Sequence, residues 1–331
     1  STVKLVIPMA GFGKRLRPHT YSRPKPLLNV AGKSMLAHIL DKFEGLDIEE
    51  VVFIVGWLGE QVEEYVRANY DFPARFVEQK ELLGQAHALW LAKDYLKGPM
   101  FIIFVDTLFE ADLTGLKEEK ADAVAFVKEV EDPRRFGVAV VGEGGYVTSF
   151  IEKPPTLEHK LAVVGLYYIK NSPLLLECIK ELLEKDIKTK GEYYLADAFQ
   201  LMIDHGARFA VREVDVWEDC GKPETMLKTN RYLLEHGHDN SAKIKALGFL
   251  VIPPVNIHPS AKITASVVGP YATIAAGCEV RGSIVRNSII DEEAVIEDAL
   301  LEHSLIGRKA RIRGSYRRLN VGDTASVDLG S

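Results

Sequence analysis

The chain has 331 residues, of which 47% are hydrophobic and 27% are charged. This length supports a full-sized hydrophobic core and a second, smaller unit. The formal net charge is −6, with acidic and basic residues mixed along the chain. That balance excludes the basic field that a nucleic-acid-binding protein needs.

The three cysteines, Cys178, Cys220 and Cys278, lie far apart and form no CxxC pair. Their spacing argues against a disulfide framework and against a structural zinc site. No apolar run approaches the roughly 20 residues that cross a bilayer, and the N-terminus lacks a charged segment leading into an apolar signal core. We therefore expect a cytoplasmic protein without a nucleic-acid or membrane partner.

Strand-like and helix-like stretches alternate over the first third of the chain. The predicted strands are residues 3–8, 51–55, 74–78 and 100–105, and the predicted helices are residues 35–43, 60–69 and 86–96. Alternation at this spacing indicates an α/β fold with a Rossmann-like, mostly parallel sheet that helices cover on both faces. The strand ends near Pro8 and Val105 should face one crevice, where such sheets bind ligands.

The character of the sequence changes after a polar, glycine-containing stretch at residues 236–241. From there on, an aliphatic residue recurs every five or six positions, which is the hexapeptide signature of a short left-handed parallel β-helix. We therefore predict two domains, residues 1–240 and residues 241–331. The predicted inward residues are Ile257, Ile263, Val268, Ile274, Val280, Val285, Ile290, Ile296, Leu301, Ile306 and Ile312.

A loop rich in glycine and cations follows the first predicted strand. Gly11 and Gly13 lie close to Lys14, Arg15 and Arg17. Glycines let backbone N–H groups approach phosphate oxygens closely, and the cations supply the countercharge. The third glycine of the dinucleotide fingerprint is missing, which disfavours a dehydrogenase. The loop therefore predicts a phosphate site, against the alternative of a solvated turn.

Lys25 lies between Pro24 and Pro26, which fix the backbone on both sides of this one cation. The whole motif, Gly-x-Gly-x-Arg-Leu-x-Pro-x-Thr-x-x-x-Pro-Lys-Pro-Leu at residues 11–27, resembles the N-terminal signature of sugar-1-phosphate nucleotidylyltransferases. The resemblance extends over essentially the whole chain. It is closest to the glucose-1-phosphate thymidylyltransferase branch that carries a C-terminal left-handed β-helix.

The resemblance implies a nucleotidyltransferase domain followed by the β-helix, and it assigns roles to several residues. It implies nucleotide binding by Ala10, Gly11, Gly13, Lys14, Arg15, Gln79 and Gly84, with Arg15, Lys25 and Asp106 as the catalytic residues. The Gln79 amide can both donate to and accept from a pyrimidine edge. His87 is expected to be a packing residue and not a general base, because the nucleophile of this reaction is already an anionic phosphate.

Two aspartates are candidates for a Mg²⁺ site. Asp106 directly follows an apolar strand, where a carboxylate can hold a cation or simply cap the strand. In the family the matching aspartate is a Mg²⁺ ligand that glycine precedes and asparagine follows, whereas this chain has Val105 and Thr107 there. Asp219 lies in a segment similar to the family's Trp-x-Asp-x-Gly, and it is favoured over Glu218 as the second ligand.

The family's Glu-Lys-Pro segment matches Glu152 and Lys153, which implies binding of the sugar and its phosphate. Two adjacent charges on a surface are otherwise ordinary solvated groups. Gly137, Val163 and Tyr167 resemble residues that line the sugar pocket, although Tyr167 also suits a core position. Glu192 and Asp197 resemble a further segment near the sugar. His258 and His303 of the β-helix are expected to be structural, against an acetyltransferase role.

The resemblance implies transfer of a nucleoside monophosphate from a nucleoside triphosphate to a sugar 1-phosphate, with pyrophosphate released and Mg²⁺ as the cofactor. We expect dTTP and glucose 1-phosphate as substrates, with UTP as the first alternative and GTP or CTP after it. A subunit that binds sugar nucleotides without catalysis is the rival from another class. We also expect a homo-oligomer.

Overall fold

The structure is a computed structural model, and it describes residues 2–330. The chain divides into two compact units, which are Ser1–Leu28 with Lys33–Thr229, and Asn29–Gly32 with Asn230–Ser331. We call them the sheet unit and the β-helix unit. In chain order they meet inside helix α6 (Pro223–Glu235). The domain boundary at residue 240 remains a prediction about where the chain can be cut.

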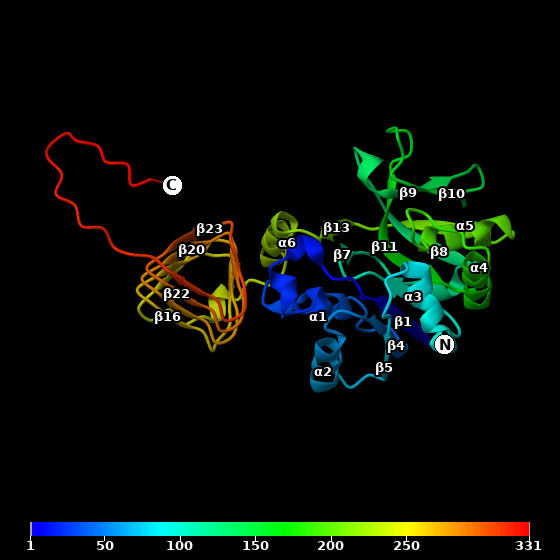
Figure 1. Cartoon of the computed structure of the whole chain (residues 1–331), viewed down its shortest axis with the longest axis horizontal. Helices are drawn as coiled ribbons and strands as arrows, with labels where there is room; N and C mark the ends of the chain where they lie inside the picture. The colour runs from blue at the N-terminus through cyan, green and yellow to red at the C-terminus, as the bar shows by residue number, and fades with distance from the viewer. Residues whose placement is uncertain (1, 331) are drawn as a thin grey trace. The chain divides into compact units, whose positions relative to one another are not determined.

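The sheet unit (Figure 1) contains a nine-stranded sheet with the strand order β10-β9-β11-β6-β1-β4-β5, in which β8 also pairs with β11, and β12 pairs with β8. Its strands are β1 (Val3–Pro8), β4 (Ile48–Val55), β5 (Ala74–Glu78), β6 (Met100–Ile103), β8 (Ala123–Glu129), β9 (Gly137–Val141), β10 (Val147–Glu152), β11 (Leu161–Ile169) and β12 (Phe209–Glu213). Its helices are α1 (Met35–Asp41), α2 (Gly59–Asn69), α3 (Gln85–Leu91), α4 (Ser172–Glu184) and α5 (Leu195–Asp204).

The strands predicted from the first third of the chain form the parallel part of this sheet. β1 pairs in parallel with β4 and β6, and β4 pairs in parallel with β5. The α/β prediction is confirmed here. Beyond β6 the sheet is mixed, because β11 runs antiparallel to β6, β8 and β9.

Both faces of the sheet are covered by other parts of the chain, because β1 is buried at every position. On one face, Val6 and Ile102 belong to a buried cluster with residues of α3, α4 and α5, and these three helices lie together in Figure 1. On the other face, Phe101 meets Phe43, which follows α1, with ring centroids 5.3 Å apart. The parallel strands are therefore rigid, and their carboxyl ends form a fixed edge.

A small two-stranded ribbon stands beside this edge and explains how two distant acids meet. β7 (Thr107–Glu110) pairs antiparallel with β13 (Val216–Asp219), and Asp219 is opposite Thr107. The N–H of Cys220 also donates to the carbonyl of Asp106 at 3.0 Å. Asp106 and Asp219 therefore occupy neighbouring positions at one end of the ribbon.

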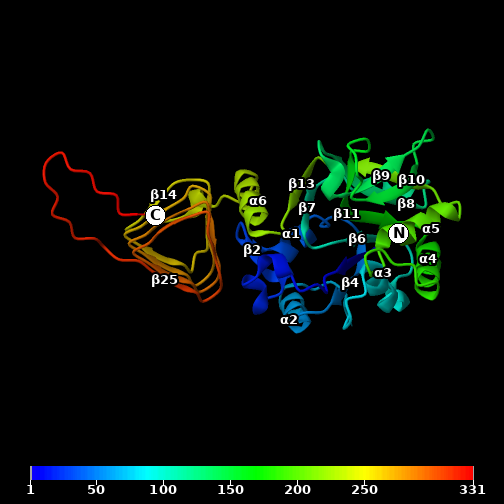
Figure 2. The same ribbon diagram turned by 45° about the horizontal axis from the view of Figure 1, so that its top comes forward.

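The β-helix unit consists of three four-stranded sheets of short parallel strands, stacked coil on coil in Figures 1 and 2. The strands of the first sheet are β14 (Leu250–Val251), β17 (Val267–Val268), β20 (Ile284–Arg286) and β23 (Leu300–Glu302). The second has β15 (Val255–Ile257), β18 (Ala272–Ile274), β21 (Ser288–Ile290) and β24 (Leu305–Ile306). The third has β16 (Lys262–Thr264), β19 (Glu279–Arg281), β22 (Val295–Glu297) and β25 (Arg311–Arg313).

The hexapeptide prediction is confirmed by the core of this unit. Ile257, Ile274 and Ile290 are register partners in successive coils, and all three are buried. The other predicted inward residues belong to the same cluster or pack against it. The parallel strands are consistent with a left-handed β-helix. Separately, none of the helices in the described chain is long and apolar enough to span a membrane.

Candidate active site

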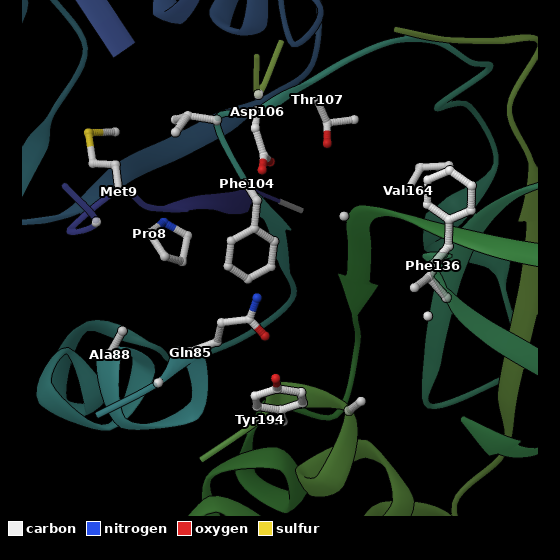
Figure 3. Close-up of a pocket in the computed structure, with 18 of the residues that line it drawn as sticks. Pro8, Met9, Gln85, Ala88, Phe104, Asp106, Thr107, Phe136, Val164 and Tyr194 are labelled. Carbon is white, nitrogen blue, oxygen red and sulfur yellow. The ribbon is translucent and has the colours of Figure 1, made fainter. Parts of the chain in front are cut away.

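A cavity of about 810 Å³ opens at the carboxyl edge of the parallel strands. Pro8 at the end of β1 and Asp106 after β6 both line it, as the prediction of a shared crevice requires. In Figure 3, Asp106 and Thr107 lie at one end, Gln85 and Tyr194 lie at another, and Phe136 lies on the far side. The cavity therefore has distinct ends for different parts of a ligand.

The glycine-rich loop after β1 forms one wall of the cavity, and Ala10, Gly11, Gly13, Lys14 and Arg15 all line it. Gly13 has a left-handed backbone with φ of 64°, and a Cβ there would lie 2.9 Å from Thr20. The Thr20 hydroxyl donates to the Gly13 carbonyl at 2.7 Å and holds this turn. A Cβ on Gly11 would meet nothing within 4 Å. The loop is therefore fixed at Gly13 and has open space at Gly11.

Lys25 and Asp106 meet at the same end of the cavity. The Lys25 Nζ lies 3.9 Å from Asp106 Oδ2, and their side chains are 14% and 42% exposed. A short 3₁₀ turn (Lys25–Leu27) that begins after Pro24 presents the lysine. Because the lysine is held in place and the carboxylate remains accessible, this pair can act on a charged ligand that enters the cavity.

Arg15 and Asp219 both lie close to Gly221. A Cβ placed on Gly221 would lie 2.7 Å from Arg15 Nη2 and 3.0 Å from Asp219 Oδ1. The Gly221 N–H donates to the same Asp219 oxygen at 2.8 Å. This glycine therefore orients the aspartate and leaves room for the guanidinium.

A buried thiol lies close to this charged end of the cavity. The pKa of Cys220 is raised to about 12, mainly by burial and to a smaller extent by the Asp219 and Asp106 carboxylates, while a hydrogen bond with Thr229 and the charge of Lys25 act in the opposite direction. All three charges therefore lie within electrostatic range of one atom. The thiol itself stays protonated at neutral pH, so it is not a candidate nucleophile.

The two aspartates fit the expected Mg²⁺ in their chemistry. Mg²⁺ commonly takes one or two protein carboxylates and completes its octahedron with phosphate oxygens and water. Within residues 2–330, there is no group of three or more His, Cys, Asp or Glu side chains suited to hold a metal ion. A pair of carboxylates beside a phosphate loop suits Mg²⁺ and does not suit a closed zinc site.

Gln79 and Gly84 line another part of the cavity. Gln79 is only 5% exposed, and its Nε2 donates to the Gly84 carbonyl at 3.1 Å. Gly84 has φ of 113°, and a Cβ there would lie 2.5 Å from the Tyr193 carbonyl oxygen, so only glycine fits. The place of a Cβ at Gly84 is thus already taken by the protein's own backbone, and nucleotide binding at Gly84 remains a prediction.

The residues predicted to bind the sugar meet at a third part of the cavity, where Gly137, Glu152, Val163 and Tyr167 all line it. A Cβ on Gly137 would lie 2.9 Å from Glu152 Oε2 and 3.2 Å from Val163, so glycine leaves room for both. Burial raises the pKa of Tyr167, with a smaller contribution from Glu152, and this phenol therefore stays neutral. Tyr167 both belongs to the core and faces the cavity.

Some residues considered from the sequence lie elsewhere. Lys153 is exposed and is not among the lining residues, and its proposed contact with the sugar phosphate remains a prediction. Glu218 and Asp197 also lie outside the lining, and Asp197 accepts from the Thr189 hydroxyl at 2.6 Å. In the β-helix, the His258 ring pairs with Ser260 at 2.7 Å, a local contact that fits a structural role.

The structure adds residues that the sequence patterns did not select. Phe104, Tyr194 and Trp217 line the cavity, and Trp217 packs edge-on against Phe136 with centroids 5.1 Å apart. Glu192 also lines the cavity, which favours the family resemblance noted for its segment. Aromatic residues are ordinarily core residues, so no sequence signal marked these as lining a pocket.

Comparison with known proteins agrees with the geometry. Residues 4–236 match the family model described as nucleotidyl transferase, which spans more than half of the chain. This chain belongs to the nucleotidyl transferase family.

The matched relatives include one that is a sugar-phosphate enzyme by name. The chain is 33% identical over 238 residues to the bifunctional protein GlmU of Methanococcus vannielii, covering 70% of this chain and 55% of that protein. It thus spans about half the length of the GlmU relatives that it matches. It is 30% identical to the UTP–glucose-1-phosphate uridylyltransferase AglF of Haloferax volcanii, covering 70% of this chain and 97% of AglF.

A solved structure of a putative glucose-1-phosphate thymidylyltransferase from Bacillus anthracis is also similar. It has a TM-score of 0.60 and 25% identity, covering 70% of this chain and 95% of that one.

Proposed function

We propose that this chain transfers a nucleoside monophosphate from a nucleoside triphosphate to a sugar 1-phosphate and releases pyrophosphate. The observation that carries the proposal is the meeting of two cations and two carboxylates at one end of the cavity. These are Arg15 and Lys25 with Asp106 and Asp219. The buried Gln79 amide and the exposed Glu152 carboxylate, which suit a base and a sugar, also line the cavity.

The chemistry needs no protein nucleophile. A phosphate oxygen of the sugar phosphate attacks the α-phosphorus, the bond to the β-phosphate oxygen breaks, and pyrophosphate leaves with the electron pair. The configuration at the sugar carbon is retained, because the new bond joins oxygen and phosphorus. Catalysis then consists of positioning the two phosphates and stabilising the negative charge.

Each charged residue has a role in this proposal. Arg15 binds the triphosphate and the leaving pyrophosphate, and Lys25 stabilises charge at the α-phosphate. Asp106 and Asp219 would hold Mg²⁺, which neutralises phosphate oxygens when bound. Glu152 accepts from a sugar hydroxyl, and Lys153 pairs with the sugar phosphate when that ligand is present.

For the substrates, we propose glucose 1-phosphate with dTTP, or with UTP as the alternative. The resemblance of the chain and the Bacillus anthracis neighbour favour the first, and the relative AglF favours the second. The three cysteines are free and buried in the structure, which agrees with the cytoplasm as the compartment.

We also propose that the chain forms a homo-oligomer through the first sheet of the β-helix unit. Leu250, Val267, Ile284 and Leu300 are register partners in four successive coils and form one outward column. Leu250 and Leu300 are 68% and 79% exposed. An exposed aliphatic column of this kind is typical of an interface.

The other outward faces of the unit differ from this column. On the third sheet, Arg281 and Arg313 pair with Glu297, which gives a charged surface. On the second sheet, Thr273 is buried and its hydroxyl donates to Asn230 of α6. The apolar column is therefore the face that suits a second copy.

A pyrophosphate-release assay tests the function. The full chain is given each nucleoside triphosphate with glucose 1-phosphate and related sugar phosphates, with and without Mg²⁺. We expect Mg²⁺-dependent release that requires both substrates. Tight binding of nucleotide sugars without release under any combination would replace the proposal with the non-catalytic alternative.

A further inference from the structure

We propose that His87, together with the Gly84 carbonyl, determines which way the Gln79 amide points, and that the site thereby favours nucleobases with a ring N–H at the edge being read. Uracil, thymine and guanine have such a group, whereas cytosine and adenine present a ring nitrogen acceptor there. The inference rests on the proposed nucleotide site, and it concerns base selection only.

The position of Gln79 is fixed by its backbone. It directly follows β5, and its N–H donates to the carbonyl of Val55 at the end of β4 at 2.8 Å. The residue is 5% exposed and lines the cavity. Its amide therefore has little freedom except rotation about its own terminal bond, which exchanges the positions of the oxygen and the nitrogen.

Two contacts settle that rotation. The Gln79 Nε2 lies 3.1 Å from the carbonyl oxygen of Gly84 and 3.2 Å from Nδ1 of His87. An amide nitrogen carries two hydrogens and cannot accept, so Nδ1 of His87 must be the acceptor. His87 is consequently neutral, with its proton on Nε2.

With both Nε2 hydrogens used inside the protein, the group that Gln79 has left for a ligand is its carbonyl oxygen. A fixed acceptor favours a base that brings an N–H and opposes one that brings a lone pair. The selection therefore depends on two acceptors, Gly84 and His87, that the ligand itself does not touch.

These two acceptors are held as one piece. The Gly84 backbone lies against Tyr193, and the Tyr193 N–H donates to Leu83 at 2.9 Å while its carbonyl accepts from Ala86 at 3.0 Å. His87 follows on the first turn of α3. The Gln79 amide therefore meets a rigid arrangement of acceptors.

The charge state of His87 fits this role. Burial lowers the pKa of His87, and the Glu81 carboxylate on the preceding loop acts in the opposite direction. The imidazole is therefore neutral at pH 7. Protonation of His87 at lower pH would place a hydrogen on Nδ1, facing the hydrogens of Gln79 Nε2. Nδ1 could then no longer accept a hydrogen bond from Gln79.

The test measures nucleotide binding by the full chain with calorimetry, using UTP, dTTP, GTP, CTP and ATP. We expect the wild type to bind at least one of the first three about tenfold or more tightly than CTP and ATP. His87→Phe should narrow that preference by about tenfold, because a ring without an acceptor leaves one amide hydrogen unpaired. His87→Asn keeps an oxygen near the place of Nδ1 and should retain the preference within about threefold.

Two further measurements separate selection from packing. The preference of the wild type should be lost as the pH falls well below the usual histidine pKa of about 6.5, because burial lowers the pKa of His87, whereas the preference of His87→Asn should not change. His205→Phe, at an exposed histidine after α5, serves as the matched control and should leave all five affinities unchanged.

The inference is overturned if the wild type binds CTP or ATP as tightly as the other three nucleotides. It is also overturned if His87→Phe keeps the full preference, or weakens all five equally with a lower melting temperature. If the wild type shows the binding preference but releases no pyrophosphate, the proposed function is contradicted and this inference still holds.

Discussion

The sheet unit and the β-helix unit differ in how many residues share the same structural role. In the β-helix, Ile257, Ile274 and Ile290 occupy equivalent inward positions in successive coils, so each of them has a neighbour with the same packing role. In the sheet unit, Asp106 and Asp219 come from distant segments and meet once. The stability of the β-helix unit is therefore distributed over many equivalent residues, whereas the proposed catalysis in the sheet unit depends on a few individual side chains.

The largest effect is expected at the two cations of the cavity. Lys25→Ala and Arg15→Ala should lower kcat by about 10² to 10³ while KM for the nucleotide changes less than about tenfold. The triphosphate is bound by several redundant groups, whereas charge at the α-phosphorus in the transition state is reached by few. Steady-state kinetics over a range of nucleotide concentrations measure both constants.

Lys93→Ala is the matched control, because this lysine is exposed and lies outside the cavity. It should leave both constants unchanged. A steep rise in KM at constant kcat in the Lys25 or Arg15 variant would make these residues binding groups and remove their catalytic assignment.

A loss of about 10²-fold is expected from Asp106→Asn and Asp219→Asn, since each removes a charge that would hold Mg²⁺. The amide keeps the shape of the side chain, so the melting temperature should stay close to that of the wild type. Turnover is measured as a function of Mg²⁺ concentration. Asp94→Asn, at an exposed acid, is the control, and near-normal turnover in either site variant would exclude that residue from the metal site.

A third prediction concerns the stability of the β-helix unit. Ile290→Ala should lower the free energy of unfolding of the β-helix unit by about 2 to 5 kcal/mol, because it opens a cavity in a fully buried coil. Ile312→Ala, in the partly buried last coil, should cost less. Circular dichroism during denaturation checks both variants. A matching loss of kcat at 25 °C would show that the two units are not independent, contrary to the comparison.

The sequence predicted the fold better than the site, and the reason is periodicity. The parallel strands and the hexapeptide coils carry repeating apolar patterns, which follow directly from burial. The mixed half of the sheet was not predicted, because β8 to β12 need long-range pairing that no local pattern encodes. Motif residues such as Lys25 and Asp106 were found, whereas Phe104 and Tyr194 were not, since an aromatic residue looks the same in a sequence whether it lies in a core or in a pocket wall.

The contact between Gln79 and His87 shows a second limit. The sequence identified Gln79 as a base reader and His87 as a packing residue, but the amide orientation depends on a hydrogen bond between side chains eight positions apart. Such a contact follows from the turn between β5 and α3, where Gly84 is pinned to Tyr193. The role of His87 could therefore be inferred only once that turn was known.

The smallest effect on catalysis is expected at the outer face of the β-helix. Leu300→Lys places a charge on the exposed aliphatic column, where a second copy would have to bury it without a partner. We expect the mass in solution, measured by light scattering, to fall toward that of a single chain, with kcat within about twofold of the wild type.

The matched control lies on the charged face of the same unit. Arg313 is exposed on the third sheet, and Arg313→Lys keeps the positive charge. This substitution should therefore leave the mass in solution unchanged. If Leu300→Lys also leaves the mass unchanged, the column is not an interface. If instead it lowers kcat together with the mass, assembly supports catalysis, and the two units are coupled more closely than their contrast in architecture implies.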